Sequence, residues 1–245
     1  MRKGFTLVEL SIVLVIIGLL IGGILVGQSL IESSKLNGFV KQITQLDIAA
    51  TNFKLKYNQI PGDSNLMTLK GNNDRLVKDS YSNDDYLQGE IGFAWVHLSE
   101  AGMLQDQYSR IATNGTTVEY GVHVPKINYG EIDGGVVIGT PLNGPDPWYN
   151  NNVMWISHFP ESTNYTWGGA CSGCGYVFTT AQAFAADKKM DDGLPREGIA
   201  RAASTSEFGT AGVSCINGSD EYYLDSATPR SCNMIVKLFS LGGGE

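Results

Sequence analysis

The chain has 245 residues, with 17 basic and 25 acidic side chains and a formal net charge of −8. This acidic balance argues against a nucleic-acid-binding protein, because phosphate contacts need clustered Lys and Arg. Hydrophobic residues make up 42%, which excludes a disordered chain, and 30 Gly with 8 Pro disfavour a purely helical bundle.

An apolar run opens the chain. From Phe5 to Val26 it contains one charged residue, Glu9. As a helix this run would measure about 33 Å, which is enough to cross the roughly 30 Å hydrocarbon core of a bilayer. Arg2 and Lys3 precede it, and basic residues there favour a cytoplasmic N-terminus.

Two ordinary explanations of this run leave features unexplained. A removable signal peptide would use Arg2 and Lys3 as its basic region, but no A-x-A-like cleavage site follows. A simple membrane anchor would not hold Glu9, because an ionised residue inside a span costs on the order of 2.5–3.5 kcal/mol. Glu9 therefore needs a functional explanation.

The string MRKGFTLVEL resembles the prepilin signal of type IV pilins and type II secretion pseudopilins. The resemblance implies that a prepilin peptidase cuts between Gly4 and Phe5, that Phe5 is then N-methylated, and that Glu9 acts in filament assembly. Thr6 and Ser11 can bond back to helix carbonyls, so we expect them to be tolerated rather than functional.

Charge balance supports a pairing of Glu9 with Phe5. Cleavage after Gly4 would leave a cationic amine on Phe5, since an α-amino group has a pKa near 7.7–8.0. A buried cation and a buried carboxylate each need a partner of opposite charge. We therefore expect Glu9 of one subunit to lie beside the Phe5 amine of its neighbour.

The helical pattern continues past Val26 as an amphipathic helix and ends before Pro61, because proline and the residue before it resist helix. We predict an α+β, pilin-like fold in which this helix packs on an antiparallel sheet. The expected divisions are a leader at 1–4, a membrane-spanning assembly half at 5–26, an amphipathic half at 27–60 and an exported head at 61–245. Apolar residues at three- and four-residue steps carry the pattern: Leu36, Phe39, Val40, Ile43, Leu46, Ala50, Phe53 and Tyr57.

A polar loop and a second helix come next. The segment 63–85 is rich in Asn, Asp and Ser. Its oxygens could hold calcium, but no position fits the EF-hand spacing, and a solvated acidic loop is the favoured interpretation. A helix is expected from about 88 to 104.

The rest of the head alternates strands and turns. Alternating Val residues predict a strand over 118–124, and further strands are expected at 134–140, 153–159, 176–180 and 234–239. A short helix is expected over 180–189, ending at the turn sequence MDDGLP. Asp191 and Asp192 could ligate a cation, although turn chemistry explains them.

All four cysteines lie in the last third of the chain, on the expected exported side. Their even number suggests disulfides, for which three connectivities exist. We favour Cys171 with Cys174 and Cys215 with Cys232, and the second pair resembles the disulfide-closed C-terminal loop of pilins. Zinc would need two close Cys pairs, and a redox C-x-x-C would need a βαβ context, neither of which is present.

Support for catalysis is weak. His97, His123 and His158 are scattered, and no hydrolase, phosphate-loop or dinucleotide motif occurs. His97 is expected to be a partly buried structural residue. Aromatic side chains in the middle of the head could form an adhesive patch, but core packing is their commoner role. They are Trp148, Tyr149, Trp155, Tyr165 and Trp167.

The resemblance implies a structural subunit of a type IV pilus-like filament, without enzyme activity, cofactor or metal. The alternatives are a pseudopilin of a type II secretion system and a membrane-tethered adhesin or binding protein. The implied partners are other pilin subunits, prepilin peptidase, an inner-membrane assembly platform and, before assembly, membrane lipid; no nucleic acid is expected. The implied location is the inner membrane with an exported head, and then an extracellular or periplasmic filament.

Overall fold

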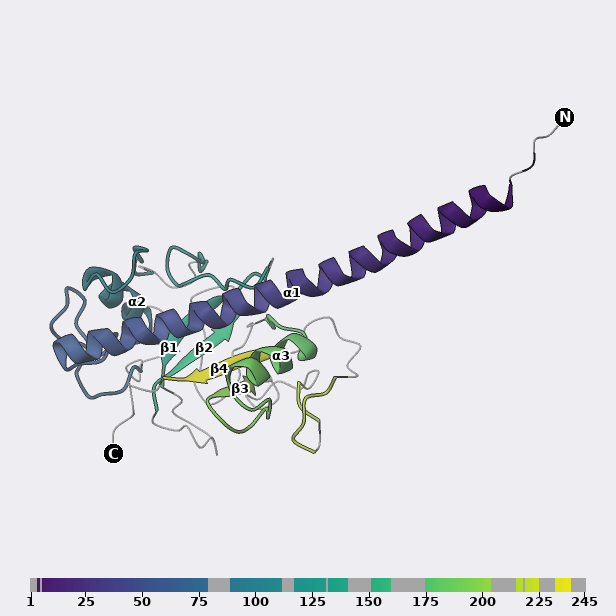
Figure 1. Ribbon diagram of the computed structural model, residues 1–245. Helices are drawn as coiled ribbons and strands as arrows, with labels where there is room; N and C mark the ends of the chain where they lie inside the picture. The colour runs from purple at the N-terminus through teal and green to yellow at the C-terminus, as the bar shows by residue number, and fades with distance from the viewer. Residues whose placement is uncertain are drawn as a thin grey trace.

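The computed structural model describes residues 4, 6–78, 89–111, 117–130, 132–140, 151–159, 175–203, 215–217, 219–224 and 232–238. One helix, α1 (Leu7–Tyr57), runs through 51 residues without a break. Its first half projects alone, and its second half carries the head (Figure 1). The expected end of the helix is confirmed, because Asn58 adopts the left-handed conformation and caps α1.

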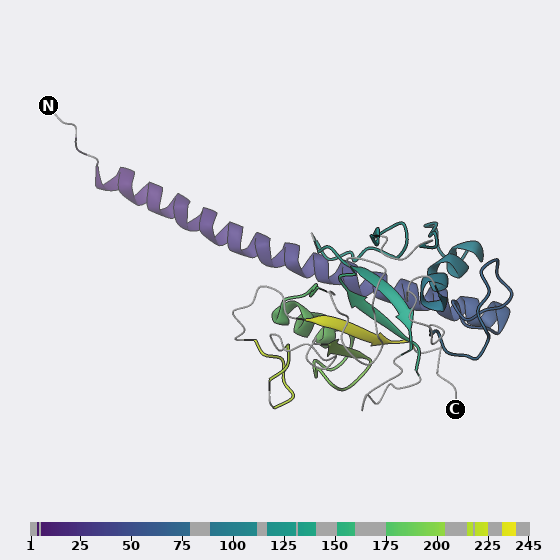
Figure 2. The ribbon, with the colours of Figure 1, turned by 180° about the vertical axis from the view of Figure 1, so that it is seen from behind.

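The described head residues form a four-stranded antiparallel sheet with the order β1-β2-β4-β3. The strands are β1 (Gly135–Gly139), β2 (Val153–Ser157), β3 (Ala200–Ala203) and β4 (Asn233–Lys237). Val137 pairs with Trp155, and Trp155 pairs with Ile235. Every residue of β1 and β2 is buried, so both faces of these strands are covered. The sheet lies across α1 when the molecule is seen from behind (Figure 2).

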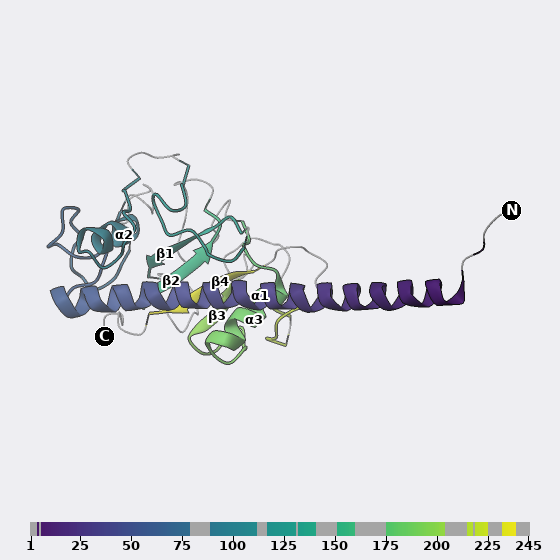
Figure 3. The same cartoon turned by 45° about the horizontal axis from the view of Figure 1, so that its top comes forward.

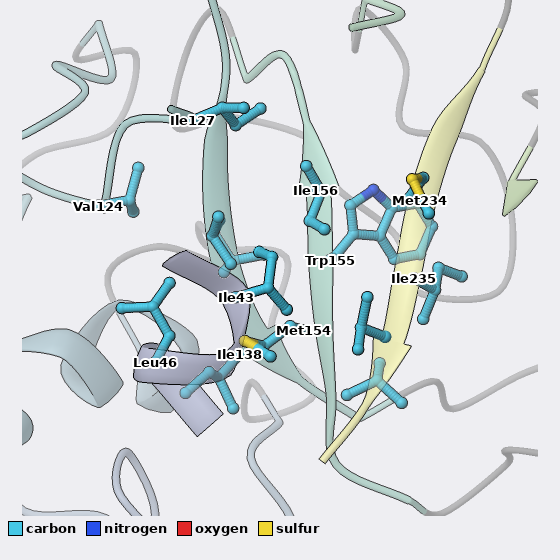
Figure 4. Packing of buried hydrophobic residues seen from close by; sticks show 14 of the residues in the cluster. Ile43, Leu46, Val124, Ile127, Ile138, Met154, Trp155, Ile156, Met234 and Ile235 are labelled. Atoms are coloured by element: carbon cyan, nitrogen blue, oxygen red, sulfur yellow. The ribbon is translucent and has the colours of Figure 1, made fainter. Parts of the chain in front are cut away.

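The core forms where α1 meets the sheet. Phe39, Ala50 and Phe53 of α1 are fully buried. Figure 4 shows Ile43 and Leu46 beside Ile138 and Met154 of the sheet. This packing confirms the predicted α+β, pilin-like architecture of a long helix on an antiparallel sheet.

Two shorter helices flank the sheet (Figure 3). Helix α2 (Glu90–Glu100) packs on β1, where the Trp95 Nε1–H donates to the Val136 carbonyl at 2.8 Å. Helix α3 (Thr180–Met190) begins with a capping box, in which Thr179 and Gln182 satisfy each other's backbone N–H. Both helices were expected, α2 with longer bounds.

Two predicted strands are not formed as strands, and one strand of the structure was not predicted. The segment 118–124 forms a turn at Gly121, whose φ of 89° demands glycine, with His123 N donating to the Glu119 carbonyl. The segment 176–180 contributes an isolated bridge from Phe178 to Cys232, because Thr179 already caps α3. Strand β3 was not predicted, since the sequence Ala-Arg-Ala-Ala has low strand propensity and forms only by pairing with β4.

Candidate functional site

The N-terminal edge of α1 is the first candidate site. Gly4 is exposed, and a Cβ added there would meet no atom within 4 Å. Helix α1 begins at Leu7, so Gly4 lies before the first turn. Phe5 lies outside the described residues.

Thr6 and Glu9 form a reciprocal capping box at this edge. Thr6 N and Thr6 Oγ1 donate to Glu9 Oε2 at 2.8 and 2.9 Å, and Glu9 N donates to Thr6 Oγ1 at 3.3 Å. Two otherwise unpaired backbone donors of the helix start are thereby satisfied. The carboxylate also lies at the positive end of the helix dipole. Glu9 is therefore held by its own chain in the first turn.

Thr6 does not bond back to a helix carbonyl, contrary to what was expected of it. Its side chain caps α1 and fixes the Glu9 carboxylate, whereas Ser11 bonds back to the Val8 carbonyl at 2.9 Å, as expected. The T-x-x-E spacing from Thr6 to Glu9 is the sequence signature of a capping box. That spacing could have identified Thr6 from the sequence.

The surface beyond this edge is apolar and uncovered. Helix α1 is long and apolar enough to cross a membrane, and none of its most apolar window is buried by the described chain. Gly18, Gly22, Gly23 and Gly27 have open space around them. A bare apolar surface of this length needs lipid or protein around it. It fits the membrane anchoring that the sequence predicts.

The head contains one of the two favoured disulfides. Cys215 is bonded to Cys232, with their Cα atoms 5.1 Å apart. Both cysteines are fully buried, and the bond ties the segment before Tyr222 to the start of β4. Cys171 and Cys174 lie outside the described residues.

The loop after α1 keeps many exposed residues, as expected of a solvated loop, but part of it is buried. Asp63 and Ser64 are fully buried. Asp63 accepts backbone N–H groups from Asp74 and Arg75, at 3.0 and 2.7 Å, and Glu90 of α2 accepts two more. Burial of these backbone donors is possible because the carboxylates pair with them. The carboxylates hold the loop in place, and we do not assign them to a metal.

The turn after α3 is built in a similar way. Tyr222 donates to Asp187 Oδ2 at 2.6 Å, and Leu194 N donates to Asp192 Oδ1 at 2.7 Å. Asp191 accepts the N–H of Ile199. These contacts support the turn role expected for Asp191 and Asp192, and the group is not assigned to a metal.

The three histidines have separate sets of partners. His97 is fully buried between the Gly62 N–H and the Leu69 carbonyl, which agrees with a structural role. His123 accepts the N–H of Glu119, and His158 lies 3.2 Å from the Tyr120 hydroxyl. In the described part of the chain the structure does not bring these histidines together as an acid–base group.

The proposed aromatic patch includes one described residue. Trp155 lies in β2 and is 9% exposed, so it belongs to the core. The others, Trp148, Tyr149, Tyr165 and Trp167, lie outside the described residues.

Comparison with known families identifies the N-terminal segment. Residues 1–25 match the family model for the prokaryotic N-terminal methylation motif. No curated protein and no solved structure matches the chain. The matched segment contains Gly4, Phe5, the Thr6–Glu9 capping box and most of the uncovered apolar run. The chain therefore carries the prepilin signal that type IV pilins and type II secretion pseudopilins share.

Proposed function

We propose that this chain is a structural subunit of a type IV pilus-like filament. In this proposal prepilin peptidase cuts between Gly4 and Phe5, Phe5 is N-methylated, and subunits assemble through the apolar half of α1. The head, residues 61–245, lies outside the membrane. The chain acts as a building block and carries out no reaction of its own.

One observation carries the proposal: a single carboxylate sits at the edge of an apolar helix that the rest of the described chain leaves bare. The large apolar side chains from Leu7 to Ile31 are 45% to 85% exposed. Lipid covers this surface in the membrane, and neighbouring subunits would cover it in a filament. Assembly thus follows from apolar burial.

The charge of Glu9 then selects the register between subunits. Both Thr6 donors bond to Oε2, and none of the described residues donates to Oε1. In this proposal the second oxygen accepts the Phe5 amine of a neighbour after cleavage. The free energy of a charge pair inside an apolar bundle depends strongly on its geometry. Axial registers that separate Glu9 from the Phe5 amine are therefore disfavoured.

The proposal assigns a sequence of partners. Membrane lipid surrounds residues 5–26 first, while the amphipathic part, 27–60, supports the head. Prepilin peptidase and an inner-membrane assembly platform act next, and other pilin subunits follow. The head then belongs to an extracellular or periplasmic filament.

The experiment compares Glu9→Leu with Ser11→Ala, a change in the same turn that removes only a bond to the Val8 carbonyl. Sheared surface material is examined by electron microscopy with an antibody to the head. We expect Glu9→Leu to be inserted and cleaved but to yield no filaments, and Ser11→Ala to yield normal ones. Normal filaments from Glu9→Leu would refute the pairing role.

The pattern of labelling separates the related functions. Label along whole fibres indicates a major subunit, and label at fibre tips indicates a minor one. Fibres confined to the cell envelope, together with a secretion defect in the deletion strain, indicate a pseudopilin. Label spread over the membrane without fibres indicates a tethered adhesin or binding protein and contradicts the proposal.

A further inference from the structure

The segment that follows α1, residues 60–78, forms a strap between the end of α1 and α2. Gly71 N donates to the Ser64 carbonyl at 2.9 Å, and Asn73 N donates to the Asp63 carbonyl at 3.0 Å. A Cβ on Gly71 would lie 2.3 Å from the carbonyl carbon of Asp63, so the two chain segments touch. The strap is therefore closely packed on itself in this conformation.

Two buried carboxylates, one within the strap and one at the start of α2, bind backbone groups of the strap. Asp63 is fully buried, and Glu90, the first residue of α2, is 8% exposed. Asp63 binds the N–H groups of Asp74 and Arg75. Glu90 Oε1 and Oε2 accept the N–H groups of Asn72 and Lys78, at 2.8 and 3.2 Å. Four backbone donors of the strap thus bond to two side chains, and Asp74 N also donates to Asn72 Oδ1 at 2.8 Å.

The charges at this point do not balance when every carboxyl is ionised. Oxygen atoms of Asp63, Asp74 and Glu90 lie within 4.8 Å of one another. Lys78 forms an ion pair with the exposed Asp74, its Nζ 2.6 Å from Oδ2. Asp63 and Glu90 would then bring two negative charges close together in a buried position, which is unfavourable. One bound proton removes the repulsion and leaves each oxygen a lone pair for its N–H donor.

Two other titratable groups of α2 contact the strap. One of them stabilises the strap at high rather than low pH, and the other is exposed. His97, on the same face of α2 as Glu90, accepts the Gly62 N–H at Nδ1 and donates from Nε2 to the Leu69 carbonyl. Burial lowers the pKa of His97, so its contribution is lost as the pH falls. Glu100 is exposed and accepts the hydroxyl proton of Thr68 at 2.7 Å. Neither group accounts for a loss of stability at high pH.

We infer that the strap is a proton-dependent latch, closed while Asp63 and Glu90 share one proton and loosened when that proton is lost. This inference is independent of the filament proposal. Burial raises the pKa of Glu90 to about 7, against the Asn72 and Lys78 N–H bonds that lower it, and the nearby Asp63 and Asp74 charges add to the rise. Because the folded-state pKa is raised, the stabilisation is complete below the ordinary pKa of Glu and is lost as the pH rises through about 7.

Limited proteolysis of the full-length chain in detergent micelles tests the latch, since cleavage of a briefly opened segment follows the population of the open form. Trypsin can cut after the exposed Lys70 and Arg75, and the rate is normalised to an unstructured peptide at each pH. The linkage predicts a normalised rate about tenfold higher at pH 8.5 than at pH 6. Glu90→Gln should remove this rise, whereas the control Glu100→Gln should keep it.

A rate in the wild type that does not change with pH overturns the inference, and so does a rise that persists in Glu90→Gln. If Glu90→Gln does not fold, Asp74→Asn gives the answer from an exposed position. Removing that negative charge should move the midpoint of the wild-type transition to lower pH. An unmoved midpoint contradicts the latch.

Discussion

The two halves of α1 have the same backbone and opposite surroundings. In the head half, Phe39 and Phe53 are fully buried against the sheet and α2 region, whereas in the first half Leu7 is 85% exposed and Leu19 is 72% exposed. The head half is completed by its own chain, and the apolar half is not. The apolar surface of the first half of α1 is therefore buried only when lipid or another protein contacts it.

The largest effect is expected on processing of the N-terminus, which precedes assembly through the apolar half of α1. Gly4→Trp should abolish processing, because the proposed cut follows Gly4 and a bulky side chain there would disturb the junction. The fold should not change, since a side chain at Gly4 meets open space. Intact mass spectrometry should find the precursor with its leader.

Gly18→Ala is the matched control for this prediction, because Gly18 also has open space around it. It should be processed normally. Efficient cleavage of Gly4→Trp would show that the junction lies elsewhere.

The next prediction concerns the packing of the head half of α1. Phe39 packs edge-on against Tyr129 and Phe178, with ring centroids 5.8 and 5.3 Å apart. Phe39→Ala should lower the free energy of unfolding by about 3–5 kcal/mol. Ile48→Ala, at a position 52% exposed on the same helix, should change it by less than about 0.5 kcal/mol. Urea unfolding in detergent measures both, and equal effects would contradict the assigned core face.

The disulfide has a comparable effect on the head alone. Cys215 and Cys232 are 17 positions apart, and a closed loop of this size is worth about 3 kcal/mol. Cys232→Ser should lower the unfolding free energy by roughly that amount. A reducing agent should destabilise the wild type by more than it destabilises the variant, because only the wild type contains this bond; the same shift in both proteins would exclude this bond as the cause.

The smallest effect concerns the capping box. Thr6→Val keeps the shape of the side chain but loses its hydroxyl, at about 1 kcal/mol for the helix start. It also removes the hydroxyl donor that holds Glu9 Oε2. We expect a partial loss of filaments in sheared material, with normal yield from Thr6→Ser. Equal yields from both variants would remove Thr6 from the assembly site.

The sequence predicted the features that depend on local pattern. The end of α1 follows from Pro61. The strands at 135–139 and 153–157 follow from short apolar runs, whereas the order of the strands in the sheet could not be predicted. The T-x-x-E spacing was also visible, although its meaning for Thr6 was missed. Such signals act over a few residues.

Features that depend on distant contacts could not be predicted. Strand β3 has no strand-forming side chains and exists because β4 offers it a partner. Asp63, in a polar stretch, is buried because backbone donors 11 and 12 residues later converge on it. Glu90 and His97 contribute to the same strap only because α2 turns one face toward it.

The most direct test of the account is the N-terminal mass of the protein in sheared surface filaments. We expect these filaments to contain this chain, beginning at an N-methylated Phe5 and keeping the whole apolar half of α1. A filament protein that begins at Met1, or one that has been trimmed into the apolar run, would contradict it.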